Sequence, residues 1–261
     1  MNLPLTQEQL MIRDMIREFA RREIEPIAQE YNRKGEYPAT LVRKLGGMGL
    51  FGMMVPENYG GSGAGAVSYS LALQEIAFSC ASIAVTLSVT NLVTEPMLAF
   101  ASEEQKRDFL IPLASGEHIG AFALTEPEAG SDPGGLAAAA VKKGNTYVLN
   151  GVKQFITNGE YAGVFVVIAR TAPGKNGLTA FLINKNTPGL IIGKEEDKMG
   201  LRASNTVEII LQDCVVPAAN MLGKPGMGLQ IALKALDSGR IGIASQATGM
   251  LAACLHEGVS Y

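Results

Sequence analysis

The first part of the chain carries apolar side chains at the spacing of amphipathic helices. Thr6 and Gln9 stand three residues apart, as the two members of a capping box do, so a first helix is predicted to begin near Thr6. Apolar residues then recur at helical spacing, at Ile12, Ile16, Phe19, Ile24 and Ile27. This spacing places them on one face of a helix that packs against a core.

More helices are predicted before residue 117. Helical patterns cover residues 40–48 and 67–94, and another helix is expected after Ser102, where two glutamates favour a helix N-terminus. Residues 1–116 are therefore predicted to form an all-α N-terminal domain.

Short apolar or alternating runs replace this helical pattern after Gly116. They are separated by Gly, Asn and Pro, and they predict strands at 121–124, 147–149, 164–169, 179–183, 190–192 and 207–211. Turn sequences at 143–146 and 173–177 separate neighbouring strands. Residues 117–225 are predicted to form a middle antiparallel β domain, which makes the fold class α+β.

The segment after Pro225 is helical again and apolar on nearly every face, so it must be enclosed. A helix over residues 228–257 would be roughly 45 Å long, at ~1.5 Å per residue, and one small β domain cannot cover it. Residues 226–261 are therefore predicted to be the first helix of an incomplete C-terminal helical domain. Its packing partners would come from residues beyond this sequence or from another subunit, and truncation is the simpler explanation.

Composition narrows the classes of function. The chain has 47% hydrophobic and 18% charged residues and a net charge of -3, with its basic residues scattered, so no nucleic-acid partner is expected. The uncharged stretch at 76–94 contains many Ser and Thr, which suits a helix buried among other helices better than one facing lipid. No membrane association is expected.

The N-terminus lacks the features of a secretory or mitochondrial leader, which predicts a cytoplasmic protein or a mature, processed one. Cys80, Cys214 and Cys254 are odd in number and lack the spacing of metal ligands, so buried reduced thiols are expected rather than a disulfide framework or a metal site. The run GSGAGA at 61–66 matches a dinucleotide-binding pattern in letters. It follows no strand, so a glycine-rich loop between helices is the preferred interpretation.

Three segments carry a family resemblance. Residues 122–132 (FALTEPEAGSD), 150–159 (NGVKQFITNG) and 198–206 (KMGLRASNT) each resemble stretches of the acyl-CoA dehydrogenase family, in the family's order. The similarity extends across essentially the whole chain. It implies an FAD-dependent oxidoreductase. The residue types also suit a flavin, because its flat ring with polar edges needs apolar faces together with hydroxyl and backbone donors.

The resemblance also implies which residues contact the cofactor. Phe122, Leu124 and Thr125 would line the pyrimidine edge of the flavin, and Thr157 would hydrogen-bond its N5 atom. Phe155 would pack against the ring where many relatives have tryptophan. The full expected set is Phe122, Ala123, Leu124, Thr125, Gly130, Ser131, Phe155, Ile156 and Thr157, with Gly130 permitting close backbone approach and Ser131 reaching both cofactor and substrate.

Residues 236–244 most resemble the short-chain, butyryl-CoA type of the family. The CoA part of the substrate would be contacted by Asp237, Ser238, Gly239 and Arg240. From the residues alone, Asp237 and Arg240 could equally form an ion pair one helical turn apart.

The implied reaction converts an acyl-CoA to a trans-2-enoyl-CoA, with a glutamate as base. Most relatives place that glutamate beyond the region covered here, and a minority place it at the position of Gly239, which cannot accept a proton. No base is therefore expected in this chain. The resemblance further implies an electron-transferring flavoprotein as acceptor and a homo-oligomer, commonly a tetramer. Two alternatives are a non-catalytic flavin- or acyl-CoA-binding subunit and, less favoured, a nicotinamide enzyme that uses the 61–66 loop.

Overall fold

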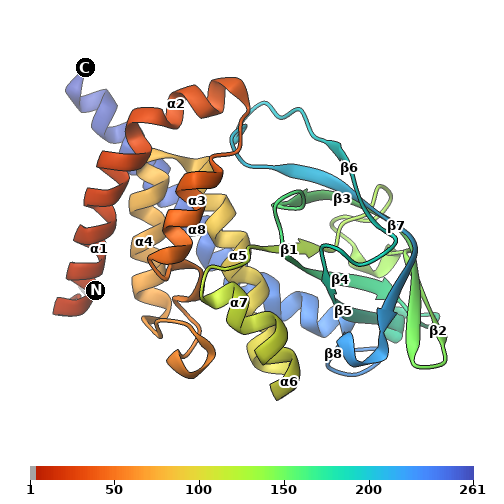
Figure 1. The fold of residues 1–261 in the computed structure, drawn as a ribbon. Helices are drawn as coiled ribbons and strands as arrows, with labels where there is room; N and C mark the ends of the chain where they lie inside the picture. The colour runs from red at the N-terminus through yellow and green to blue at the C-terminus, as the bar shows by residue number, and fades with distance from the viewer. Residues whose placement is uncertain (1–3) are drawn as a thin grey trace.

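The computed structural model describes residues 4–261, which form a group of helices beside a β domain, with one long C-terminal helix behind both (Figure 1). The helices are α1 (Gln7–Phe19), α2 (Glu25–Lys34), α3 (Ala39–Gly47), α4 (Gly65–Ser79), α5 (Ala81–Phe100), α6 (Glu103–Gln105), α7 (Ile111–Ala114) and α8 (Gly228–Ser260). A π-helical turn at Ala20–Ile24 joins α1 to α2. The predicted all-α region, β region and return to helix are all confirmed as elements of the fold.

Helix α1 begins where the sequence predicts. The Thr6 Oγ1 atom accepts a hydrogen bond from the Gln9 backbone N–H at 3.2 Å, and the Gln9 side chain accepts one from the Thr6 N–H at 3.0 Å. These bonds satisfy amide donors that have no partner within the helix. Ile16 and Ile24 are fully buried against the other helices, as their spacing predicts.

The helical pattern at 67–94 corresponds to two helices rather than one. Cys80 has extended backbone angles (φ -158°, ψ 106°), which end α4 and begin α5. An extended residue cannot continue the hydrogen-bond ladder of a helix. The sequence around Cys80 contains neither Gly nor Pro, so the usual local signals of a break are missing.

Helix α5 is a central packing element. It is long and apolar enough to cross a membrane by length and composition, yet 61% of that window is buried in the fold. It contacts α4, α8 and β1, so its apolar composition is explained by the core that it forms with them.

The β domain is one eight-stranded sheet (Figure 1). Its strands are β1 (Gly120–Ala123), β2 (Ala139–Lys143), β3 (Thr146–Thr157), β4 (Val164–Arg170), β5 (Leu178–Asn184), β6 (Leu190–Glu195), β7 (Thr206–Pro217) and β8 (Met221–Leu222), in the order β6-β7-β3-β2-β4-β5-β8, with β1 paired to β4. Most pairs are antiparallel, as predicted, but β1 and β2 each pair with β4 in parallel. The sequence did not predict β2, because its Ala and Lys residues favour strands weakly.

Helix α8 is covered on one side only. Its 33 residues span roughly 50 Å at ~1.5 Å per residue, and Figure 1 shows it behind α4 and α5. The expectation that its packing partners are absent from this chain was wrong for this face, because α4 and α5 supply them. Gly242 permits their close approach, since a Cβ atom there would lie 2.7 Å from the Tyr69 hydroxyl. Large apolar side chains remain exposed on the rest of α8: Leu233, Ile241, Ile243, Met250, Leu251, Leu255 and Val259.

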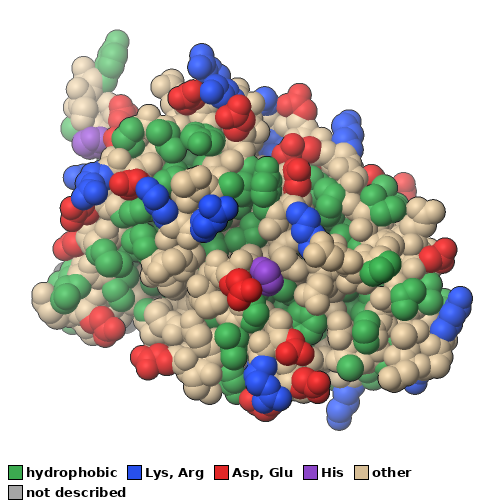
Figure 2. All heavy atoms as spheres, in the orientation of Figure 1, with side chains coloured by type: hydrophobic (Ala, Val, Ile, Leu, Met, Phe, Trp, Pro, Cys, Tyr) green, Lys and Arg blue, Asp and Glu red, His purple; other side chains and the backbone are tan. Residues whose placement is uncertain are grey.

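Charged side chains do not gather by sign on the face shown in Figure 2. Lys and Arg side chains there are interspersed with Asp and Glu. Such a surface lacks the single-sign field that steers polyanions towards a protein.

Candidate functional site

The two segments with the strongest family resemblance meet in space. The first consists of β1 and the loop that follows it, and the second is the end of β3. The Gln154 N–H donates to the Thr125 carbonyl oxygen at 2.9 Å, which joins the two main chains directly. The two segments that the resemblance assigns to one cofactor are therefore neighbours in the fold.

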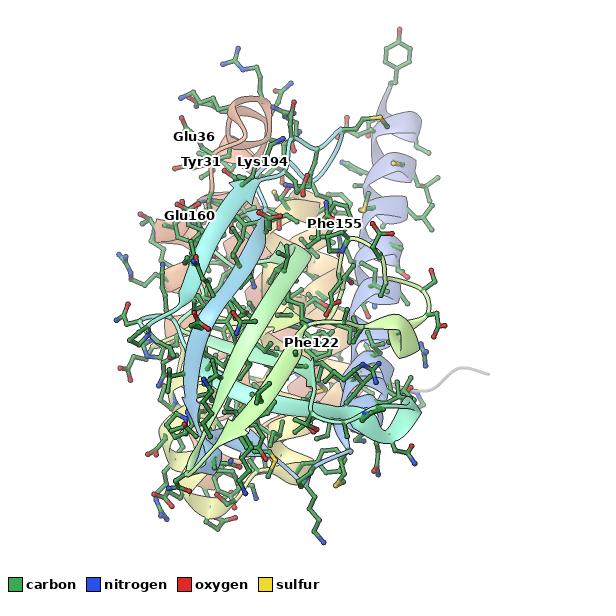
Figure 3. All side chains as sticks on the ribbon, turned by 90° about the vertical axis from the view of Figure 1, so that its right-hand side faces the viewer. Tyr31, Glu36, Phe122, Phe155, Glu160 and Lys194 are labelled. Atoms are coloured by element: carbon green, nitrogen blue, oxygen red, sulfur yellow. The ribbon has the colours of Figure 1, made fainter. Side chains whose placement is uncertain are left out.

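Phe155 is the most distinctive residue of this surface. The β3–β7 pairing shifts register between Lys153 and Ile156, so Phe155 lies in a bulge. Its φ is +59°, a left-handed conformation that costs an aromatic residue free energy, and its side chain is 57% exposed. An exposed aromatic ring held in a strained backbone is typical of a ligand contact. Figure 3 labels Phe155 and also Phe122, which lies on β1.

Two of the predicted cofactor residues point into the core instead. Ala123 is 0% exposed and Ile156 is 1% exposed, and both pack in the apolar interior of the β domain. Alternation along a strand explains this placement, because neighbours of outward-facing residues face inward. Their side chains are therefore unsuited to ligand contact, which leaves only their main-chain groups for that role. Phe122 is half-buried and Leu124 is 9% exposed.

Three hydroxyl groups of the two segments are free. Within residues 4–261, the side chains of Thr125, Ser131 and Thr157 make no hydrogen bond to another protein group. Gly130 is also open, since a Cβ atom added there would meet only Thr125 Cγ2, at 3.9 Å. No neighbouring protein atom therefore requires glycine at position 130, and the space next to Gly130 is open. An exposed aromatic face with free hydroxyls and open backbone fits a flat ring that has polar edges.

A buried ion pair lies beneath this surface. Lys153 Nζ lies 2.6 Å from Glu126 Oε1, and the two side chains are 0% and 7% exposed. The sequence pattern did not predict this pair. Desolvation lowers the pKa of Lys153, and the contact with Glu126 acts against that shift. The sequence shows a lysine within a predicted β region, but it does not reveal which residue would pair with that lysine.

The expected CoA-binding segment lies on α8 and is organised differently. Asp237 and Arg240 form an ion pair at 2.7 Å, with side chains 64% and 70% exposed, so the ion-pair alternative is confirmed. The Ser238 hydroxyl donates to the Ala235 carbonyl oxygen at 3.0 Å. Gly239 faces α5, because a Cβ atom there would lie 2.7 Å from Leu92 Cδ1. Among the described residues, no hydrogen bond or ion pair joins 237–240 to the β-domain surface.

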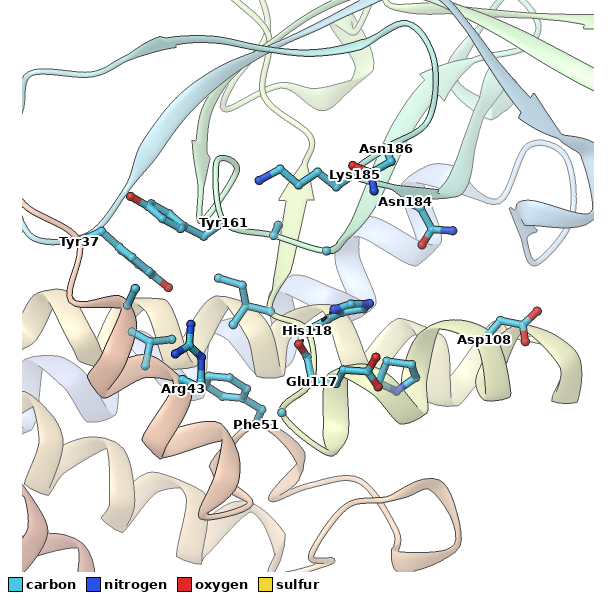
Figure 4. Close-up of a pocket in the computed structure, with 17 residues that line it drawn as sticks. Tyr37, Arg43, Phe51, Asp108, Glu117, His118, Tyr161, Asn184, Lys185 and Asn186 are labelled. Carbon is cyan, nitrogen blue, oxygen red and sulfur yellow. Dashed lines mark hydrogen bonds between the residues drawn. The ribbon is translucent and has the colours of Figure 1, made fainter.

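A cavity of about 820 Å³ lies elsewhere, between the helices and the β domain (Figure 4). Tyr37 and Tyr161 stack along its wall with ring centroids 4.0 Å apart, and Arg43, His118 and Lys185 also line it. None of the residues predicted to bind cofactor or substrate lines this cavity. The candidate site is therefore an open surface of this chain rather than this cavity.

Comparisons with known proteins identify both main regions. Residues 6–117 match the family model described as "Acyl-CoA dehydrogenase, N-terminal domain", and residues 121–214 match "Acyl-CoA dehydrogenase, middle domain". Both matches agree with the helical region and the β domain of the fold. The predicted domain limits of 116/117 and 225/226 stay predictions.

Three similar proteins cover nearly all of the chain. An acyl-CoA dehydrogenase of Bacillus subtilis (strain 168) is 51% identical over 98% of this chain and 69% of its own length. The structure of butyryl-CoA dehydrogenase from Megasphaera elsdenii matches with a TM-score of 0.97 and 43% identity, over 100% of this chain and 70% of that one. A chain of a structure described as electron transferring flavoprotein of Acidaminococcus fermentans matches with a TM-score of 0.98 and 44% identity, over the same shares.

Proposed function

This chain belongs to the acyl-CoA dehydrogenase family of FAD-dependent oxidoreductases, and we propose that it oxidises a short-chain acyl-CoA to the trans-2-enoyl-CoA. The similarity to butyryl-CoA dehydrogenase supports the short acyl chain. Under this proposal the β domain holds the flavin, and the start of α8 contributes the contacts to CoA.

The observation that carries this proposal is the surface around Phe155. Phe155, an exposed aromatic residue at φ +59°, precedes Thr157 by two residues on β3, and the bond from Gln154 to Thr125 adds the second segment. FAD, when bound, supplies an acceptor for the hydride that leaves the β carbon of the substrate. We assign the apolar face of the ring to Phe155 and Phe122, and its polar edges to Thr125 and Thr157.

The substrate contacts are assigned to two places. Ser131 is exposed in the loop that follows β1, where it can hydrogen-bond both cofactor and thioester. Asp237, Ser238, Gly239 and Arg240 are assigned to the CoA portion. Arg240 and Asp237 are exposed, and among the described residues their side chains pair with each other alone, so both can exchange that pairing for contacts to a polar ligand.

We propose that the catalytic base is not among these residues. Glu126 is held by Lys153 and by two backbone N–H groups, so its oxygens are already occupied. The side chain of Asp132 accepts from the Gly134 N–H, and Asp237 pairs with Arg240. Gly239 has no side chain and packs against α5. A glutamate beyond the covered region, as the family resemblance implies, would remove the α proton.

Three further assignments rest on the family. We propose an electron-transferring flavoprotein as electron acceptor, supported by the structure from Acidaminococcus fermentans that contains a similar chain. A homotetramer in the cytoplasm remains the expected assembly and location.

Titration of the chain with FAD tests the flavin assignment. We expect the visible absorbance bands of FAD to shift and its fluorescence to change until one FAD is bound per chain. The nicotinamide alternative predicts no such change but binding of NADH, followed by its fluorescence. The absence of any FAD binding by a folded chain would overturn the proposal.

A further inference from the structure

The buried ion pair of Glu126 and Lys153 lies close to the proposed flavin surface. Lys153 precedes the bulge that contains Phe155, and Glu126 follows directly after Thr125. The pair therefore stands at the junction of the two segments that form the proposed flavin surface. Its N–O distance of 2.6 Å is that of a strong charge-assisted hydrogen bond.

Lys153 bonds to the first segment in two places. Its Nζ donates to Glu126 Oε1 and also to the Leu124 carbonyl oxygen, at 3.0 Å. These contacts bracket Thr125, whose carbonyl accepts from the Gln154 N–H. Leu124 and Glu126, the residues on either side of Thr125, are thus both hydrogen-bonded to Lys153 of β3.

Glu126 extends the connection to a third stretch of chain. Its oxygens accept from the Ala137 N–H at 2.7 Å and from the Ala138 N–H at 3.1 Å. These amides lie just before β2, at the far end of the loop that contains Gly130 and Ser131. One carboxylate therefore holds both ends of this loop.

Stability alone is a weak reason for such a pair. Removing two charges from water is costly, and a buried ion pair is often no more stabilising than apolar residues of the same volume. Its directional bonds instead define the relative position of the chains that they join. Positions that must hold a ligand gain from a rigid support of this kind.

We propose that Glu126 and Lys153 are positioning residues, which hold the loop of residues 124–131 and the Phe155 bulge in the geometry that binds flavin. This inference rests on the proposed function. The two side chains act through Thr125, Phe155 and Thr157 and need not contact the cofactor themselves.

The test uses the full chain and three variants: Lys153→Met, Glu126→Gln and the double variant. Lys34→Met is the matched control, because Lys34 forms an exposed pair with Glu30 at the same kind of distance, 2.7 Å. FAD affinity, the visible spectrum of bound FAD and the thermal midpoint are measured for each. Glu126→Gln keeps the size of the side chain, so it serves if Lys153→Met does not fold.

The single variants should weaken FAD binding at least about tenfold, a change of ~1.4 kcal/mol, and should alter the spectrum of the bound flavin. The double variant leaves no buried charge, so its thermal midpoint should recover while its FAD affinity stays low. If the pair had only a structural role, the thermal midpoint and the FAD affinity of the double variant would recover together. Folded variants with the affinity and spectrum of the unchanged chain would overturn the inference.

Hydrogen exchange separates failure of this inference from failure of the proposed function. In the chain without FAD, Lys153→Met should speed amide exchange at 124–131 and 153–157 together and leave α1 unchanged. If the unchanged chain binds no FAD, the proposed function fails. Faster exchange in both segments of Lys153→Met would then show only that the pair stabilises the two segments together. If it binds FAD and exchange in the two segments is not coupled, the positioning role fails.

Discussion

The two proposed ligand regions, on the β domain and on α8, are built in opposite ways. On the β domain, a buried pair and a main-chain bond from Gln154 to Thr125 hold the Phe155 surface in place. On α8, Asp237 and Arg240 are exposed, and their side chains form an ion pair with each other within a single turn. The flavin region is thus organised by contacts between distant segments, and the CoA region by local ones.

This difference indicates where function and stability are coupled. Replacing a residue beneath the β-domain surface disturbs the core and the site together. Replacing one of the exposed residues Asp237 and Arg240 should remove a proposed ligand contact and leave the fold almost unchanged. Four measurements compare the two regions, from the largest expected effect to the smallest.

Lys153→Met should lower the free energy of unfolding by about 3–5 kcal/mol, because it leaves the Glu126 carboxylate buried without its cation. Urea unfolding followed by circular dichroism measures this loss. The exposed-pair control Lys34→Met should give no measurable change. A loss below ~1 kcal/mol for Lys153→Met would show that water reaches Glu126 and that the β-domain region is less rigid than its contacts indicate.

The reactivity of the cysteines should also differ between the β domain and α8. Burial raises the pKa of Cys214, on β7, to about 11, and also raises that of the buried Cys80. Cys254 on α8 is exposed, so the expectation of a buried thiol was wrong there. At pH 8 only about one Cys214 thiol in a thousand is ionised, so Cys254 should react with a maleimide at least ~100-fold faster. Peptide mass spectrometry after timed labelling measures the rates. Equal rates for Cys214 and Cys254 would contradict the buried β7 position.

Phe155 should show opposite effects on stability and binding. Phe155→Gly relieves the left-handed backbone and should raise the free energy of unfolding by up to about 1 kcal/mol. Both Phe155→Gly and Phe155→Ala should weaken FAD binding about tenfold, because the aromatic face is lost. Thermal denaturation and FAD titration measure the two effects. Unchanged affinity in both variants would remove Phe155 from the flavin site.

Asp237→Asn should have the smallest effect on the fold. Exposed ion pairs one turn apart contribute little, so the free energy of unfolding should change by less than about 0.5 kcal/mol. FAD affinity should not change, whereas binding of CoA, followed by calorimetry, should weaken. A parallel loss of FAD affinity would mean that the two regions are coupled after all.

The elements of the fold were largely predictable because their signals are local. The capping box of Thr6 and Gln9 and the apolar runs at 164–169 and 179–183 identify α1, β4 and β5 from neighbouring residues. The helix break at Cys80 and strand β2 were not predicted, since neither has a strong local signal. The parallel pairing of β1 with β4 joins segments far apart in sequence, which periodicity cannot reveal.

The sequence by itself determined the family, the succession of helical and β regions and the two segments that the family places on the flavin. These depend on residue order and spacing, which the chain carries before it folds. Tertiary structure decided which of the predicted residues face outward: Phe155 does, while Ala123 and Ile156 are buried. It also decided that Lys153 meets Glu126 and that one face of α8 packs on α4 and α5. Each of these outcomes depends on contacts between distant segments, whose partners no local pattern specifies.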